Sequence, residues 1–70
     1  MSIQTDVANG DKIEALVDNF IFAKARGKVT LVRGNFVRIN SSQVSEKGSN
    51  EWIPSNFPLD VRKTDIIRKI

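Results

Sequence analysis

Apolar residues recur at every second position on both sides of an Arg-Gly-Asn tripeptide in the middle of the chain. Val29 and Leu31 alternate with Lys and Thr before the tripeptide, and Val37 and Ile39 alternate with Phe and Arg after it. A period of two is that of a β-strand with one buried face, and a Gly-Asn pair supplies the positive φ of a tight turn. Residues 28–40 are therefore predicted to form a hairpin with these four side chains on its inner face.

The stretch from residue 11 to residue 27 fits two patterns. Ile13, Ala15 and Val17 alternate with the residues between them, which indicates a half-buried strand. Apolar residues also recur from Ile13 with the helical spacing i, i+3, i+4, i+7 and i+8, and Gly27 stands where a helix-ending glycine belongs. The β-branched and aromatic residues of the stretch favour a strand followed by a loop. We expect that structure, with the helix as the alternative.

The second half of the chain changes between polar, turn-forming segments and short apolar runs. Residues 40–50 are predicted to form a polar loop. Residues 51–53 are predicted to form a short strand that stops at Pro54, because proline cannot donate to a β-ladder. Residues 55–58 are predicted to be an irregular or 3₁₀ turn, and residues 61–70 to form the last strand. The chain is therefore expected to be mostly β.

The composition limits the size of the core and the chemistry of any site. Seventy residues correspond to one domain, assigned to residues 10–70, and the polar residues 1–9 are expected to be disordered or frayed. The chain contains no cysteine and no histidine, which excludes disulfides, Cys/His zinc sites, Ser-His-Asp triads and Cys-His dyads. Asp60 and Asp65 lie close in sequence to Arg62 and Lys63, so we expect them to form ion pairs on the surface and not to act as catalytic acids. We therefore expect no enzyme activity, no cofactor and no metal.

Positive charge is concentrated in the middle and at the end of the chain, although the formal net charge is only +3. Residues 21–40 contain five cations and no acid, and residues 61–70 contain four cations and one acid. This asymmetry indicates an anionic partner, either nucleic acid or an acidic protein surface. The alternative is that long basic side chains merely solvate the exposed face of a sheet.

The predicted nucleic-acid-binding residues are the five central cations, Lys24, Arg26, Lys28, Arg33 and Arg38. Cations on and around one hairpin contact phosphates and give binding that depends on salt but tolerates any base sequence. Phe36, on the predicted outer face beside Arg38, adds a ring that can stack on an unpaired base. No zinc-finger spacing and no RNP-type motif is present, so base-specific recognition is not predicted.

Several short motifs follow one another in an order that is found in a known group of folds. They are Gly-Asp-Lys-Ile-Glu-Ala at residues 10–15, an aromatic loop at residues 20–22, the hairpin, and Glu-Trp-Ile-Pro at residues 51–54. This order resembles the Tudor, chromo-barrel and Agenet group of SH3-like barrels. It also resembles KOW domains and the small SH3-like accessory subunits of photosynthetic complexes. The resemblance implies a single small SH3-like five-stranded barrel with a short 3₁₀ turn before the last strand.

The resemblance to Tudor-like readers also implies a cage of aromatic rings that holds a methylated lysine or arginine by cation–π attraction. The matching positions in this chain are Phe20, Phe22 and Trp52, with Phe36 or Phe57 as a further wall. The chain departs from the pattern in having no tyrosine and in placing Ile39 where many readers have an aromatic residue. Ordinary core packing is the alternative role for each ring.

These observations predict a non-enzymatic binding module of the Tudor or chromo-barrel type, associated with chromatin or nucleic acid. It is expected to bind DNA or RNA through the basic hairpin and a histone-type methylated peptide weakly. The alternative is an accessory subunit that docks on a larger protein complex. No apolar run approaches the roughly 20 residues of a membrane span, and the first residues do not resemble a signal peptide. We therefore expect a soluble, intracellular protein, nuclear if the organism is eukaryotic, with no membrane partner.

Overall fold

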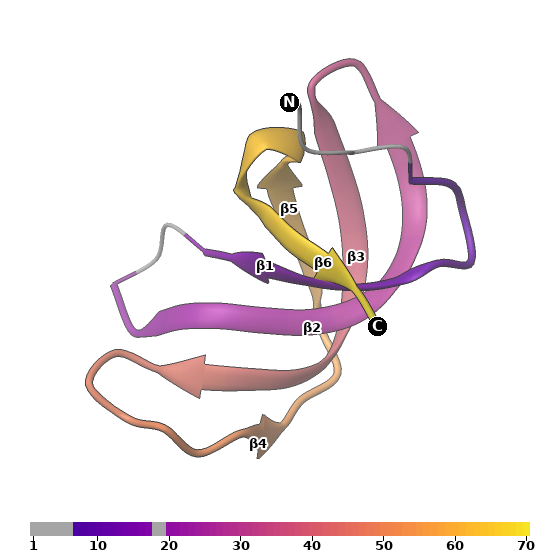
Figure 1. Ribbon diagram of the computed structural model, residues 1–70. Helices are drawn as coiled ribbons and strands as arrows, with labels where there is room; N and C mark the ends of the chain where they lie inside the picture. Colours follow the sequence, from indigo (N-terminus) through magenta and orange to yellow (C-terminus); the bar gives the residue numbers. More distant parts are fainter. Residues whose placement is uncertain (1–6, 18–19) are drawn as a thin grey trace.

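Six antiparallel strands and one turn of 3₁₀ helix form the part of the chain that the computed structural model describes, residues 7–17 and 20–70 (Figure 1). In chain order the elements are β1 (Lys12–Leu16), β2 (Phe22–Arg33), β3 (Phe36–Glu46), β4 (Ile53–Pro54), β5 (Pro58–Arg62), the 3₁₀ turn η1 (Lys63–Asp65) and β6 (Ile66–Lys69). The sheet order is β4-β3-β2-β1-β6, and β5 pairs with β3 on the same edge as β4. The prediction of a mostly β chain is confirmed.

The number of strands and their closure differ from the prediction. The sheet has six strands rather than five, partly because the single strand expected over residues 61–70 is divided into the end of β5, η1 and β6. In the described part of the chain no pairing joins β6 to β4 or β5, so hydrogen bonds do not close the sheet into a barrel. A 3₁₀ turn does precede the last strand, but it is η1 and not the segment 55–58.

Within residues 11–17 and 20–27 the structure has β1 and the first half of β2, as the strand-and-loop prediction expects, and not the alternative helix. Ile13 and Ala15 of β1 are completely buried, and Val17 is half-buried. β1 pairs along its whole length with the first half of β2, and this pairing satisfies the backbone groups that a helix would otherwise have bonded internally. Residues 18–19 of the predicted loop, and residues 1–6 of the segment expected to be frayed, lie outside the described residues.

Gly27 lies in the middle of β2, a long strand that bends along its length (Figure 1), and next to a register shift in the pairing of β2 with β3. A Cβ atom at this position would lie 2.5 Å from the carbonyl oxygen of Asn40 and 2.9 Å from the Cα atom of Ser41, both on β3. Only a glycine lets the two backbones approach this closely. Gly27 therefore permits a close strand contact and does not end a helix.

The predicted hairpin is confirmed, with one error on its inner face. Gly34 has a φ of 57°, and it forms with Asn35 a two-residue turn between β2 and β3. Val29, Val37 and Ile39 are buried as expected, whereas Leu31 is 38% exposed. The register shifts between Val29 and Leu31, and one extra residue in a strand turns the following side chain to the other face.

The polar segment 40–50 is not a loop over most of its length, because β3 continues to Glu46. Its serines are held by bonds that the sequence pattern does not show. Ser41 is buried, and its hydroxyl donates to the carbonyl oxygen of Phe57 at 2.8 Å and accepts from the Ser55 hydroxyl at 2.9 Å. This contact fastens the irregular segment between β4 and β5 to β3. The short strand predicted at residues 51–53 is found as β4, Ile53–Pro54, which shares only Ile53 with the prediction and includes Pro54 instead of stopping before it.

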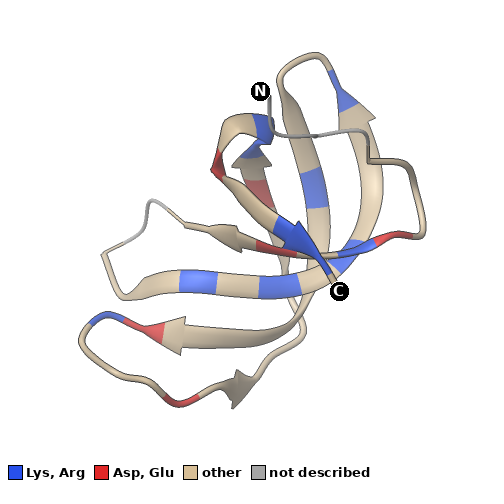
Figure 2. Ribbon diagram, in the orientation of Figure 1, with Lys and Arg blue, Asp and Glu red and all other residues tan. Residues whose placement is uncertain are grey.

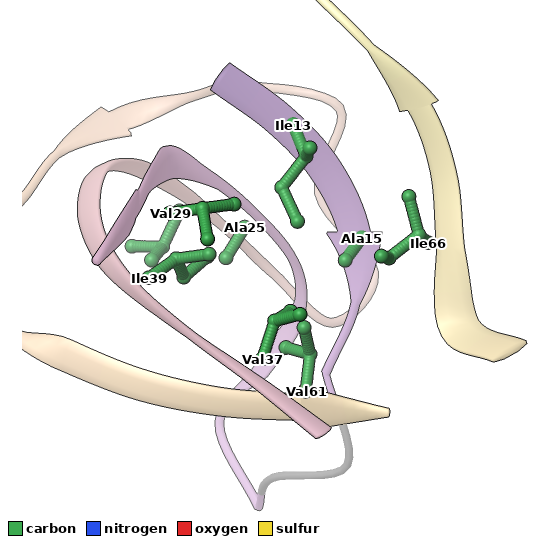
Figure 3. Packing of buried hydrophobic residues seen from close by; sticks show 9 residues of the cluster. Ile13, Ala15, Ala25, Val29, Val37, Ile39, Val61 and Ile66 are labelled. Atoms are coloured by element: carbon green, nitrogen blue, oxygen red, sulfur yellow. The ribbon is translucent and has the colours of Figure 1, made fainter. Parts of the chain in front are cut away.

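The core consists of small aliphatic side chains from five of the strands. Its members are Ile13, Ala15, Ala25, Val29, Val37, Ile39, Val44, Val61 and Ile66. Figure 3 shows these side chains from β1, β2, β3, β5 and β6 directed toward one common interior. Phe22 and Phe57 pack against this cluster as a stacked pair, with ring centroids 6.0 Å apart. The bent sheet therefore wraps around its own core, and its outer face is left for other roles.

Candidate nucleic-acid interface

The five cations predicted to bind nucleic acid separate into two places along the β2–β3 hairpin. Lys24, Arg26 and Lys28 alternate with the buried Ala25 and Gly27 in β2, so they point away from the core. The other two, Arg33 and Arg38, lie close to the hairpin turn. Figure 2 shows basic positions spaced along β2 and further ones on β6. The three cations of β2 therefore lie on the outer face of the sheet, away from the core.

Arg26 is held by a buried carboxylate on the neighbouring strand. Glu14 of β1 is only 5% exposed, and it pairs in register with Arg26 on β2 and with Arg68 on β6. Its Oε1 atom accepts hydrogen bonds from Arg26 Nε and from Arg68 Nη2, both at 3.2 Å. One carboxylate thus lies between two guanidinium groups, which removes the cost of burying it unpaired.

The Arg26 guanidinium has two further partners on the other side of β2. Its Nη1 donates to Gln43 Oε1 at 3.3 Å, and its central carbon lies 3.9 Å from the centre of the Trp52 ring. This short distance is that of a cation–π contact. We call the connected residues Arg68, Glu14, Arg26, Gln43 and Trp52 the arginine row. The row links β6, β1, β2, β3 and the segment before β4 across the outer face.

Three lysines beside the arginine row have no such partners. Lys12 of β1 lies directly opposite Lys28 of β2, and Lys24 lies opposite Leu16. No ion pair in the described part of the chain involves Lys12, Lys24 or Lys28. We call these three residues the lysine group. Like charges directly opposite each other destabilise a sheet, so the Lys12–Lys28 pair is a local cost of the fold.

The two arginines near the turn differ from each other. Arg38 makes a two-pronged pair with Asp60 of β5, from Nε to Oδ1 at 2.8 Å and from Nη2 to Oδ2 at 3.3 Å. The hydrogen bond from Arg38 lowers the pKa of Asp60; desolvation opposes this shift, and the positive charges of Arg38 and then Arg33 act in the same direction as the hydrogen bond. Arg33 forms no ion pair with a described residue.

The aromatic residues predicted to form a cage are distributed over separate places. Phe20 is fully exposed before the start of β2, and Phe22 is half-buried against Phe57. One face of the Trp52 ring is already covered by Arg26. Phe36 is 51% exposed at the hairpin turn, at the opposite end of the β2–β3 ladder from Phe22. The described structure therefore offers a methylated lysine no set of converging ring faces.

Two hollows lie on either side of Phe36 and Asp60, which line both of them. The smaller, of about 280 Å³, is also lined by Leu31, Arg33, Val37 and Arg38. The larger, of about 390 Å³, is also lined by Leu16, Val17, Leu59, Val61, Arg62 and Asp65. The smaller hollow thus combines apolar walls with two arginines, whereas the larger one contains two carboxylates and one arginine.

Sequence reasoning missed Lys12, Glu14, Gln43 and Arg68 as part of the outer face. The alternation of Ile13 and Ala15 does place Glu14 on the outside of β1. Its burial, however, comes from neighbours on β2 and β6, and only the strand register brings those neighbours together. Lys12 belongs to an acidic part of the sequence, so a count of charge along the chain does not associate it with Lys28.

No protein-family model, curated protein or solved structure matches this chain. Over residues 7–17 and 20–70, no group of three or more acidic side chains is placed so that it could hold a metal ion. None of the described helical structure is long and apolar enough to cross a membrane.

Proposed function

We propose that this chain is a non-enzymatic module that binds nucleic acid through its phosphates, on the outer face of β1 and β2. The observation that carries the proposal is the opposition of Lys12 and Lys28 on adjacent strands, neither of which forms an ion pair with a described acid. Such a pair is unfavourable in the free protein. A polyanion laid across it converts the repulsion into attraction and releases its own counterions.

The neighbouring arginine row supports this assignment by holding the sheet beneath the lysines. Glu14 fixes Arg26 and Arg68 on the strands that flank β1, so β1 and β2 present a rigid surface. The outer face of β1, β2 and β6 then carries five cations, Lys12, Lys24, Arg26, Lys28 and Arg68, against the single carboxylate Glu14. This excess of positive charge attracts a polyanion even though the whole chain has a net charge of only +3.

We further propose that the sheet is an SH3-like open barrel. The support is its connectivity: β5 lies at one edge of the sheet, β6 lies at the other, and only the three residues of η1 separate them. The bend of β2 and the common core of five strands favour the same architecture. The Tudor or KOW kinship and the chromatin association stay predictions. Recognition of a methylated peptide is not part of the proposal, because the aromatic residues do not converge.

The test is the binding of a fluorescently labelled ten-nucleotide single strand at increasing salt concentration. Three lysine–phosphate contacts give a slope of log K against log salt of about −2, or roughly a 15-fold loss of affinity between 50 and 200 mM salt. Lys28→Glu should weaken binding and reduce the magnitude of the slope by about one. The matched control is Lys47→Glu, an exposed lysine on the turn after β3. Absence of binding at low salt, salt-independent binding, or an equal loss in the control would overturn the proposal.

The alternative of an accessory subunit docked on a larger complex has less support. Exposed apolar side chains, among them Leu16 and Phe36, do line the larger hollow. The same hollow contains Asp60 and Asp65, and nothing in the structure shows what would cover it. The lysine group has no role in that function, so the accessory-subunit alternative is less favoured than nucleic-acid binding.

A further inference from the structure

We infer that the smaller hollow holds one unpaired base of the bound strand, so that the preferred ligand is single-stranded rather than duplex nucleic acid. We call this site the hairpin hollow; it is lined by Leu31, Arg33, Phe36, Val37, Arg38 and Asp60. The inference rests on the proposed function, because the phosphates of the same strand lie on the lysine group. It goes further by naming the chemical class of ligand.

The walls of the hairpin hollow are suited to a flat aromatic ring. Phe36 is 51% and Leu31 38% exposed, although both are large apolar side chains. The register places Phe36 opposite Arg33, and Leu31 opposite Arg38. A half-exposed phenyl ring supplies a stacking face that every base can use. With a volume of about 280 Å³, the hollow lies just below the roughly 300–1,000 Å³ of pockets for drug-sized ligands, a size that suits a single base.

The polar groups of the hairpin hollow suit a base that carries a phosphate. Two hydrogen bonds to Asp60 hold the Arg38 guanidinium in a fixed plane, and a planar guanidinium stacks well on an aromatic ring. Asp60 compensates the charge of Arg38, whereas Arg33 forms no ion pair with any described acid. Arg33 is therefore the cation available to the phosphate next to the stacked base.

The strand register places the hairpin hollow close to the lysine group. Lys28 pairs with Asn40 on β3, and Arg38 is the next outward residue along that strand. Two residues of β-strand span about 7 Å, which is about the length of two stacked nucleotides. A strand whose phosphates lie on Lys12 and Lys28 therefore reaches the hollow with its next base or the one after it.

The larger hollow on the other side of Phe36 does not compete for the same ligand. It presents Asp60 and Asp65 with only one arginine, Arg62, which is itself paired with Asp65 at 3.4 Å. Two carboxylates repel a phosphate backbone. A ligand that carries phosphates is therefore attracted to the smaller hollow and repelled by the larger one.

The experiment compares three labelled ligands of equal length with the intact chain: oligothymidine, the same backbone without bases, and a DNA duplex. We expect oligothymidine to bind about 5- to 150-fold more tightly than the abasic strand, the range that one stacked base gives. We expect the duplex to resemble the abasic strand, because its bases are already stacked and paired. Equal binding of oligothymidine and the abasic strand would overturn the inference and leave the proposed function standing. No binding of any ligand would overturn both.

Three variants locate the stacked base. Phe36→Ala and Phe36→Leu should both abolish the preference for oligothymidine and leave the affinity for the abasic strand unchanged. The leucine variant keeps an apolar side chain, so it separates the loss of the ring from damage to the fold. Phe20→Ala, which removes a fully exposed ring outside the hollow, is the control and should retain the preference. If Phe36→Leu also retains it, the base does not stack in the hairpin hollow.

Discussion

The arginine row and the lysine group lie side by side on β1 and β2, yet they are in opposite electrostatic states. Glu14 and Arg26 face each other across the two strands, and two residues away Lys12 and Lys28 face each other in the same register. The first pair is linked to Arg68, Gln43 and Trp52 by contacts of 3.2 to 3.9 Å. Neither member of the second pair forms an ion pair with a described residue, and the two like charges repel each other.

The difference teaches that a binding surface is indicated by cations without partners in the protein, and not by the number of cations alone. Arg26 lies at the centre of the sheet and is positively charged, but its hydrogen bonds and its ring contact are already made within the protein. Lys12 and Lys28 have compact charges on long flexible stems, and no described acid pairs with them. An anion gains most where the protein has left charge uncompensated, which is the lysine group.

The largest effect is expected from Gly27→Ala, because it disturbs the backbone that carries both groups. The added Cβ would lie 2.5 Å from the Asn40 carbonyl oxygen, and overpacking of this kind destabilises by about 3 kcal/mol or more. Urea unfolding should show a much lower midpoint, or no folded protein. Gly34→Ala is the control: its φ of 57° is unfavourable for alanine, but no atom lies within 4 Å of the new Cβ, so we expect a loss of only about 1–2 kcal/mol. Equal losses would show that the β2–β3 approach is adaptable.

The next largest effect is expected from Glu14→Gln, which breaks the arginine row without changing its shape. Loss of one partner from a buried ion pair costs about 3–5 kcal/mol. Here we expect about 1–3 kcal/mol, because the Arg26 and Arg68 side chains are 29% and 63% exposed and water screens them. The same change should strengthen nucleic-acid binding, since it releases two cations beside the lysine group. Urea unfolding and oligonucleotide titration measure the two effects, with Glu46→Gln as the exposed control. A stable variant with weaker binding would contradict the division between the two groups.

A smaller effect of opposite sign on stability is expected from Lys12→Glu. The change replaces a repulsive cross-strand pair with an attractive one, so it should raise the free energy of unfolding by about 0.2–1 kcal/mol. It should also weaken oligonucleotide binding, because one phosphate contact is lost and a repulsion is added. Stability and binding thus move in opposite directions in one variant. If they move together, the two lysines do not act as an unpaired cross-strand couple.

The smallest effect is expected from the exposed Arg38–Asp60 pair, which belongs to neither group. The hydrogen bond from Arg38 lowers the pKa of Asp60 from its ordinary value of 3.8 in the folded protein. The stabilising contribution is therefore complete above that value and is lost as the pH falls through the lower, folded pKa. The difference in unfolding free energy between wild type and Asp60→Asn should shrink between about pH 5 and about pH 2. A difference that stays constant over this interval would show that the pair is not formed in solution.

The sequence predicted the strands where local pattern and tertiary structure agree. The Gly34 turn, the inward Val29, Val37 and Ile39, and the strand at Ile13 all follow from alternation and turn chemistry. The prediction failed at Leu31, which strict alternation places on the buried face of the hairpin. The register of β2 and β3 shifts after Val29, and Leu31 is exposed as a result.

The candidate site was predicted only in part, because its essential feature is pairing between strands. The basic residues of β2 are visible in the sequence, but the neutralisation of Arg26 depends on Glu14 of β1, a carboxylate shared with Arg68, 54 residues further along the chain. The buried Ser41 gives a similar lesson, since its low strand propensity is outweighed by three hydrogen bonds to residues 55 and 57. Neither the Glu14–Arg68 hydrogen bond nor the hydrogen bonds of Ser41 can be recognised from the residues next to them in the sequence.

The pairing of β1 with β6 also has a consequence for the order of folding. Joining strands whose contacting residues are 54 positions apart carries a length-dependent loop-closure entropy of about 3.5 kcal/mol, whereas the β2–β3 turn closes over two residues. The hairpin is therefore expected to form the folding nucleus and β6 to arrive late, which φ-value analysis at Val37 and Ile66 would test. Until β6 arrives, one edge of β1 is open, and an open strand edge is where a second unfolded chain can attach.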